Sequence, residues 1–163
     1  MKKNGFTLIE LLAVIVVLGV IMSIAGTAVL KQKKKANIKE AKSLENTITK
    51  IGEDLYTHES MVGKTDDGYF YKKYKSLNSG ESIYISLTKL ANAGYIKSAS
   101  IANPSGNGTC KGYLSVKKTD EGPSFKGYIC CPNLYATGKN SNEITDCSRF
   151  NELNSSDVNL TEQ

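Results

Sequence analysis

The chain has 163 residues, 40% of them hydrophobic, and its 21 basic and 16 acidic side chains give a formal charge of +5 at pH 7. This length provides for about one domain. Residues 36–163 carry 15 basic and 15 acidic side chains, so the excess positive charge lies before residue 36. That distribution excludes a uniformly cationic protein that coats nucleic acid.

Residues 6–30 form an apolar run, FTLIELLAVIVVLGVIMSIAGTAVL, in which Glu10 is the charged residue. As a helix this run would be roughly 37 Å long, enough to cross a bilayer core of about 30 Å. It is also longer than the apolar part of a cleaved secretory signal, which has about 7–15 residues. The sequence therefore predicts a membrane-spanning segment. A plain signal peptide or a single-span anchor of an exported protein is the alternative.

Glu10 is a carboxylate in an apolar segment, where an acid at the bilayer centre costs about 2.5–3.5 kcal/mol. If the chain were cut between Gly5 and Phe6, the new amine on Phe6 would lie one helical turn from Glu10, or beside Glu10 of a neighbouring helix. An ion pair is tolerated in hydrocarbon where a lone carboxylate is not. The pattern therefore predicts cleavage after Gly5 and helices that pack side by side.

The start of the chain resembles the class III signal of type IV pilins and pseudopilins in the residues Lys2-Lys3-Asn4-Gly5-Phe6-Thr7-Leu8-Ile9-Glu10-Leu11-Leu12. The resemblance implies that a prepilin peptidase cuts after Gly5 and methylates the amine of Phe6. It also implies that Phe6 and Glu10 set the register of subunits in a filament core. The close resemblance covers residues 1–30, and a looser architectural match extends to about residue 131.

The partners that the resemblance implies are other subunits in a helical homo- or hetero-filament, the peptidase, an assembly platform protein and an assembly ATPase. Membrane lipids surround the helix before assembly. The resemblance leaves open a pilus, a competence pseudopilus or a secretion pseudopilus. Many pilins carry a proline in the second half of the apolar segment, whereas this chain has Gly19 and Gly26 there. Either glycine could loosen the helix or let neighbouring helices approach closely.

The lysines around the apolar run conflict with the resemblance on orientation. Two lysines precede the run and four follow it within residues 31–35, so the positive-inside rule would place the C-terminal side in the cytoplasm. The resemblance implies a cytoplasmic leader, residues 1–5, and a head outside the cell membrane that later joins an extracellular filament. We expect the second arrangement, because the cleavage site must face its peptidase.

Residues 31–57 continue the helical pattern beyond the apolar run. They carry one apolar stripe, formed by Ile38, Ala41, Leu44, Ile48, Ile51 and Leu55. The spacing predicts an amphipathic helix, and no proline separates it from the apolar run. The stripe lasts about two to three heptads, which is short for a coiled coil. It is therefore expected to pack on a sheet in the same chain.

Residues 58–148 are expected to form a globular head. Ser86 can cap a short helix that Gly94 ends. Residues 110–118 and 125–131 alternate apolar and polar side chains, which predicts an antiparallel hairpin with one buried face. The expected turn between these strands is Asp120-Glu121-Gly122-Pro123.

The expected fold class is α+β and pilin-like, with a long N-terminal helix packed on a small antiparallel sheet. Residues 149–163 are polar and lack periodicity, and are expected to form a flexible tail.

Four cysteines allow three complete pairings. On the predicted strands, Cys110 and Cys131 both point to the buried face, whereas Cys130 points away and can reach Cys147. This parity favours Cys110–Cys131 with Cys130–Cys147, and the alternative is Cys110–Cys130 with Cys131–Cys147. An even number of cysteines agrees with an oxidising, exported location.

No catalytic residues stand out in the sequence. His58 is the single histidine, and no cysteine spacing typical of a zinc site is present. Asp66-Asp67-Gly68 fits a surface turn better than a calcium ligand set. No enzyme activity, cofactor or metal is expected.

A second functional hypothesis is a minor pilin or competence pseudopilin that binds DNA. Its support is the lysine run at 31–35 and an aromatic and basic patch formed by Tyr69, Tyr71, Lys72, Lys73, Tyr74 and Lys75. Stacking on bases and contacts to phosphates use these residue types. For residues 31–35, anionic lipid headgroups are the simpler partner.

Overall fold

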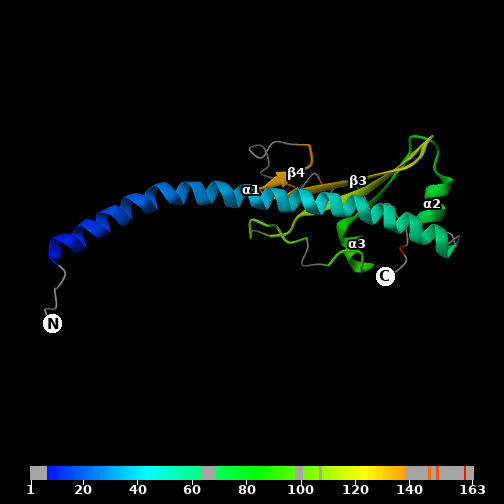
Figure 1. The fold of residues 1–163 in the computed structure, drawn as a ribbon. Coiled ribbons are helices and arrows are strands. Elements are labelled where there is room, and N and C mark those ends of the chain that lie inside the picture. Colours follow the sequence, from blue (N-terminus) through cyan, green and yellow to red (C-terminus); the bar gives the residue numbers. More distant parts are fainter. Residues whose placement is uncertain are drawn as a thin grey trace. The chain divides into compact units, whose positions relative to one another are not determined.

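The computed structural model describes residues 7–63, 69–97, 101–106 and 108–138, together with Cys147, Phe150 and Leu160. The chain divides into two compact units, residues Met1–Ala36 and Asn37–Gln163. Helix α1 (Leu8–Val62) contributes to both units (Figure 1). It ends at Val62, beyond the predicted end at residue 57. The next residue, Gly63, adopts a positive φ of 68°. A glycine in this conformation is a common helix terminator, because it has no Cβ to clash.

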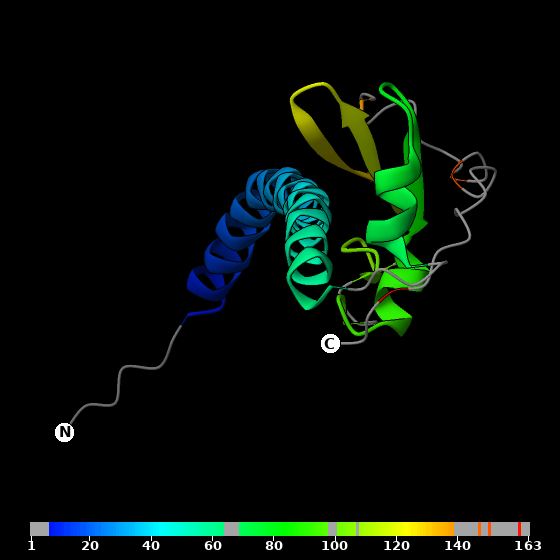
Figure 2. The ribbon, with the colours of Figure 1, turned by 90° about the vertical axis from the view of Figure 1, so that its right-hand side faces the viewer.

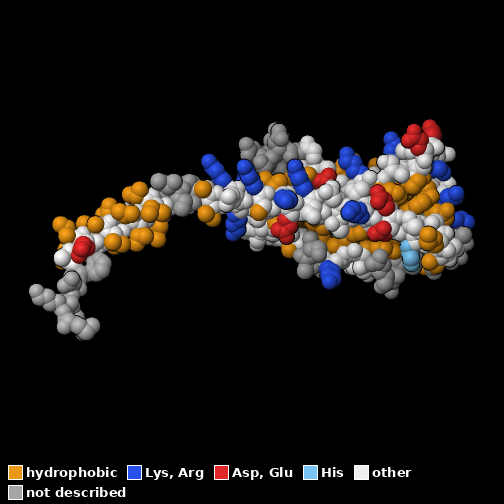
Figure 3. Space-filling model, in the orientation of Figure 1, with side chains coloured by type: hydrophobic (Ala, Val, Ile, Leu, Met, Phe, Trp, Pro, Cys, Tyr) orange, Lys and Arg blue, Asp and Glu red, His pale blue; other side chains and the backbone are white. Residues whose placement is uncertain are grey.

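In the first unit, the described large apolar side chains of α1 are exposed, with exposed fractions between 46% for Leu18 and 83% for Leu8. Figure 3 shows hydrophobic side chains covering this part of the helix. Judged by length and composition, α1 can cross a membrane. A helix that is apolar on all sides needs lipid or other apolar helices around it.

The second unit contains a four-stranded antiparallel sheet in the order β1-β2-β3-β4. Its strands are β1 (Ser82–Ser86), β2 (Lys111–Thr119), β3 (Gly122–Cys131) and β4 (Tyr135–Ala136). Two short helices, α2 (Phe70–Ser76) and α3 (Leu87–Asn92), flank β1 in the sequence. In Figures 1 and 2, the second half of α1 runs alongside the sheet. The predicted α+β, pilin-like fold is confirmed.

The predicted hairpin is present, with a tighter turn. Thr119 pairs with Gly122, so Asp120 and Glu121 alone form the turn. Gly122 has a φ of +128°, a conformation that side chains with a Cβ rarely adopt. The predicted cap is also present, since the Ser86 hydroxyl accepts a hydrogen bond of 3.2 Å from the Lys89 N–H at the start of α3.

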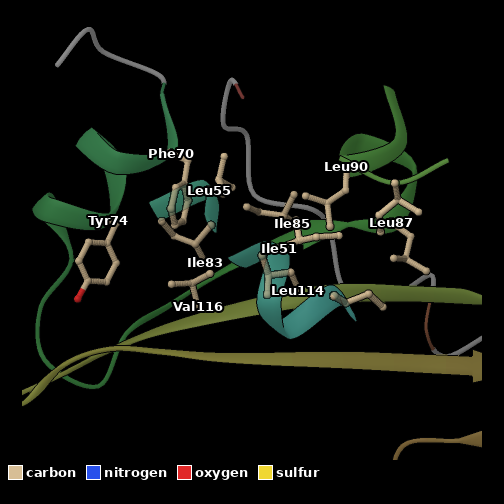
Figure 4. Packing of buried hydrophobic residues seen from close by; sticks show 12 residues of the cluster. Ile51, Leu55, Phe70, Tyr74, Ile83, Ile85, Leu87, Leu90, Leu114 and Val116 are labelled. Atoms are coloured by element: carbon tan, nitrogen blue, oxygen red, sulfur yellow. The ribbon is translucent and has the colours of Figure 1, made fainter. Parts of the chain in front are cut away.

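The apolar stripe of α1 packs into the head as predicted. Ala41, Ile48, Ile51 and Leu55 are buried, and Ile38 and Leu44 are partly buried. Figure 4 shows Ile51 and Leu55 meeting side chains from α2, β1, α3 and β2. Helix α2 and strand β1 were not predicted, and they supply Phe70, Tyr74, Ile83 and Ile85 to this core.

Two glycines allow α1 to approach the sheet closely. A Cβ on Gly127 in β3 would collide with the Glu45 carbonyl oxygen of α1 and lie 3.0 Å from the Ile48 Cβ. The Gly127 N–H donates to the Thr49 hydroxyl at 2.9 Å. On the helix side, a Cβ on Gly52 would lie 2.8 Å from side-chain atoms of Leu114 and Phe125. The helix axis is thus held close to β3.

The structure contains two disulfides, Cys110–Cys131 and Cys130–Cys147, with Cα separations of 4.2 and 5.7 Å. These are the pairs that strand parity favours. Cys110 and Cys131 pack with Ile129 on the helix side of the sheet, and Cys130 and Cys147 form a separate cluster with Ala136. Of the C-terminal segment expected to be flexible, Phe150 and Leu160 are described, and both pack against apolar clusters. The rest of 149–163 lies outside the described residues.

Candidate functional site

Gly5 and Phe6, the residues of the predicted cleavage and methylation site, lie outside the described residues. The described chain begins at Thr7, directly before α1. The Thr7 N–H and hydroxyl both donate to the Glu10 Oε2, at 2.9 and 2.8 Å. In return, the Glu10 N–H donates to the Thr7 hydroxyl oxygen at 3.3 Å. This reciprocal pair is a capping box, in which the first residue before a helix and the third residue within it satisfy each other's N–H groups.

The capping box turns the Glu10 carboxylate toward the beginning of α1. This end of a helix favours negative charge, because the first N–H groups are unpaired and the helix dipole is positive there. Glu10 contacts Thr7, and Phe6 is the residue directly before Thr7. An amine created on Phe6 would therefore be one residue away from the residue that Glu10 contacts. The hydrogen bonds between Thr7 and Glu10 were not predicted, although the Thr-x-x-Glu spacing is itself a signal for a capping box. The predicted partner of Glu10 was the amine of Phe6.

The apolar segment after Glu10 is helical through both of its glycines. A Cβ added at Gly19 or Gly26 would meet no atom within 4 Å in this chain. Lys31, Lys33, Lys34 and Lys35 follow the segment on α1 and are exposed. The first unit therefore offers an apolar helix with a carboxylate at its start and lysines at its end.

The aromatic and basic patch proposed for DNA contact is only partly a surface. Tyr74 is 4% exposed and packs with Phe70 in the core, so it cannot stack on a base in the folded chain. Tyr71 is half-buried with its ring 5.4 Å from Tyr56. The reason is helical spacing: Phe70 and Tyr74 lie one turn apart on the inner face of α2, which leaves Lys72 and Lys75 exposed. Tyr74 is therefore withdrawn as a contact residue.

A second set of aromatic and basic side chains, which was not predicted, lies on the sheet. They lie on the side of β1, β2 and β3 that alternates with the buried residues, and comprise Tyr84, Lys111, Tyr113, Lys117, Lys126 and Tyr128. The signal was present, because the alternation that assigns Leu114 and Val116 to the core assigns their neighbours to the opposite face. Because β1 was not predicted, Tyr84 could not be grouped with the side chains of β2 and β3.

Among the described residues, no group of three or more His, Cys, Asp and Glu side chains is placed to hold a metal ion. His58 is exposed near the end of α1. Asp66-Asp67-Gly68 lies outside the described residues.

Residues 1–26 match the family described as the prokaryotic N-terminal methylation motif. Comparison with curated proteins and with solved structures gives no match. The start of the chain is therefore a class III signal of the type IV pilins, attached to a helix that can span a membrane and a head with a pilin-like fold. Such a signal is the kind that type IV pilin and pseudopilin precursors carry, and the match covers residues 1–26.

Proposed function

We propose that the protein is a structural subunit, a pilin or pseudopilin, of a type IV pilus-like filament that assembles through α1. The observation that supports this most strongly is the methylation motif on a helix whose apolar side chains are exposed. A soluble monomer would hide such a surface. Before assembly the surface contacts lipid, and in a filament it contacts the same helix of neighbouring subunits.

In the proposed mechanism, the peptidase removes residues 1–5 and methylates the amine of Phe6. Cleavage also removes Lys2 and Lys3, so the mature chain keeps a positive amine at one end of the apolar helix and the lysines of 31–35 at the other. The amine is the counter-charge that Glu10 needs in an apolar surrounding. When helices pack side by side, an amine and a carboxylate at this end fix their axial register. The assembly platform and ATPase would supply the work of extraction.

The two disulfides support an exported head, because disulfides persist in oxidising compartments. The orientation in this proposal is a cytoplasmic leader and an outer head. A plain anchored or secreted protein would share the disulfides and the apolar segment. It would differ at its mature N-terminus.

The first experiment is mass spectrometry of the mature protein from its native membrane. The proposal expects a chain that begins with N-methylated Phe6. A chain that begins with Met1, or one cut near Val29 as a secretory signal would be, contradicts it.

The second experiment separates processing from assembly. A Glu10→Ala variant should be cleaved normally and form few filaments, because its helices lose the charge that sets the register. Glu53→Ala is the matched control, since Glu53 is an exposed acid of α1 in the head. Filament yield is measured by shearing and immunoblotting. Filaments at the wild-type level from Glu10→Ala would overturn the register mechanism.

A further inference from the structure

The outer face of the sheet is the face opposite α1, and its aromatic and basic side chains are Tyr84, Lys111, Tyr113, Lys117, Lys126 and Tyr128. Two residues from the C-terminal part of the chain lie on this face. Cys147 is joined to Cys130, whose sequence neighbours on both sides pack toward α1 and which therefore points outward. The Phe150 ring lies 6.0 Å from the Tyr113 ring. The chain's own C-terminal segment thus covers part of the outer face.

These two contacts give the direction in which the segment crosses the outer face. Cys130 belongs to β3 and Tyr113 to β2, and the strand order is β1-β2-β3-β4. The Phe150 N–H donates to the Cys147 carbonyl oxygen at 3.1 Å, so Cys147 and Phe150 belong to one turn. The segment therefore advances from β3 toward β1, the edge strand of the sheet.

Leu160 lies on the other side of the sheet. It packs against the core cluster that joins the apolar stripe of α1 to the buried side chains of β1, β2 and α3, part of which Figure 4 shows. Ten residues separate Leu160 from Phe150, and an extended chain of that length reaches roughly 33 Å. A path from β2 over β1 crosses one strand spacing of about 4.8 Å and one packed layer of about 10 Å. The chain is therefore long enough to pass round the edge of β1.

The charges of the segment and of the sheet favour the same path. Residues 151–163 contain three acidic side chains and no Lys or Arg. β1 to β4 contain four lysines and no Asp or Glu, and three of these lysines belong to the outer face. An acidic segment is attracted to such a surface, whereas a second cationic sheet would be repelled by it.

We propose that residues 148–160 form a strap, which crosses the outer face from Cys147, passes round the edge of β1 and enters the core at Leu160. The occupant of the outer face is then this chain's own C-terminal segment. An uncovered edge strand offers backbone N–H and C=O groups to other chains, and a covered one does not. The strap therefore keeps heads from pairing through β1. This role concerns the head alone and does not depend on assembly through α1.

Amide hydrogen exchange of the full chain in detergent, measured by mass spectrometry, tests whether the strap exists. The amides of residues 151–160 should exchange at least roughly tenfold more slowly than those of an unfolded peptide, because a docked segment must open before it exchanges. Exchange at the unfolded rate in the unaltered chain overturns the proposal, because the segment is then a free tail.

A double variant, Phe150→Ala with Leu160→Ala, should release the strap, so that exchange becomes faster both in residues 151–160 and in β1. Met61→Ala is the matched control, since the Met61 side chain is 81% exposed. Slow exchange in the β2–β3 hairpin shows that the head stays folded. If the hairpin also exchanges faster, Phe150→Ala alone, which leaves the core intact, is used instead. Exchange that matches Met61→Ala in residues 151–160 overturns the proposal.

Two measurements decide whether the strap comes from the same chain and whether it shields β1. Protection of residues 151–160 should not change with protein concentration. Protection that appears only as the concentration rises overturns the proposal, because a second copy then supplies the segment. In analytical ultracentrifugation the double variant should self-associate more than Met61→Ala, since its β1 edge is uncovered. Equal self-association overturns the shielding role.

Discussion

Thr7 and Glu10 form a capping box that holds the Glu10 carboxylate at the start of α1. The three hydrogen bonds between them keep the carboxylate near the end of α1 where the proposed cleavage would create an amine. The same bonds satisfy N–H groups that would otherwise lack partners at the helix start. In an apolar surrounding this satisfaction matters more than in water, because unpaired polar groups are costly there.

We therefore expect Thr7→Val to reduce filament yield while cleavage after Gly5 continues. Valine has a similar shape and lacks the hydroxyl that donates to Glu10 and accepts its N–H. Thr7→Ser keeps the hydroxyl and is the matched control. Sheared filaments and mature subunits are quantified by immunoblotting. If Thr7→Val assembles as well as Thr7→Ser, the hydroxyl has no part in placing Glu10.

A second prediction at the residue scale concerns Gly127. Alanine there places a methyl group against the Glu45 carbonyl oxygen and Ile48, so the head must shift. Overpacking of this kind costs about 1–3 kcal/mol. Gly19→Ala is the control, because open space surrounds its Cβ. Urea unfolding of the full chain in detergent, followed by near-ultraviolet circular dichroism, should show a lower midpoint for Gly127→Ala alone. Equal midpoints would show that α1 does not approach β3 as closely as described.

At the scale of elements, the two disulfides act on different parts of the head. Cys110–Cys131 joins the chain before β2 to the end of β3 and packs with Ala41, Ile129 and Leu134. Cys130–Cys147 closes a loop that returns to the other face of β3. The sequence separations are 21 and 17 residues, so loop closure stabilises each by about 3 kcal/mol in the chain-entropy account.

Because loop closure stabilises the head by a similar amount for each disulfide, the packing of the cysteines decides which disulfide contributes more to stability. The Cys110→Ser, Cys131→Ser pair should destabilise the head more than the Cys130→Ser, Cys147→Ser pair, since it also places hydroxyls in the cluster against α1. Urea unfolding of both double variants measures the difference. Peptide mapping without reduction should recover the two native pairs. Recovery of Cys110–Cys130 would contradict the parity argument and the structure together.

At the scale of the whole molecule, tyrosines couple the stability of the head to alkaline pH. The Tyr135 hydroxyl donates to the Glu45 Oε2 at 2.6 Å, and burial together with this bond and the carboxylate charge raises the Tyr135 pKa above its usual value of about 10. Burial is also the main cause of a raised pKa in four other tyrosines, Tyr56, Tyr74, Tyr95 and Tyr113.

The sign of the pH effect follows from these shifts. Above pH 10 the unfolded tyrosines lose protons that the folded ones keep, so the unfolded state binds fewer protons and the free energy of unfolding falls as pH rises. This stabilisation is fully present below pH 10. Urea unfolding at intervals from about pH 8 to pH 11 should show the decline. Tyr135→Phe should make it shallower, and the same slope in both proteins would contradict a raised Tyr135 pKa.

The sequence by itself determined the N-terminal segment, because a cleavage motif, an apolar run and an acid at a fixed offset are all local in the chain. Periodicity also determined the stripe from Ile38 to Leu55 and the β2–β3 hairpin, since side-chain direction follows from helical or strand spacing. The alternation of side chains along the strands also favoured one set of cysteine pairs, and the structure contains those pairs.

Only the tertiary structure decided what the segments between these elements do. The short helix α2 and the strand β1 have too few residues for a periodic signal, and their form depends on packing against α1 and β2. That packing buries Tyr74 and adds Tyr84 to the tyrosines of β2 and β3. The burial of Tyr74 and the position of Tyr84 depend on contacts between residues distant in the sequence, and no local pattern encodes those contacts.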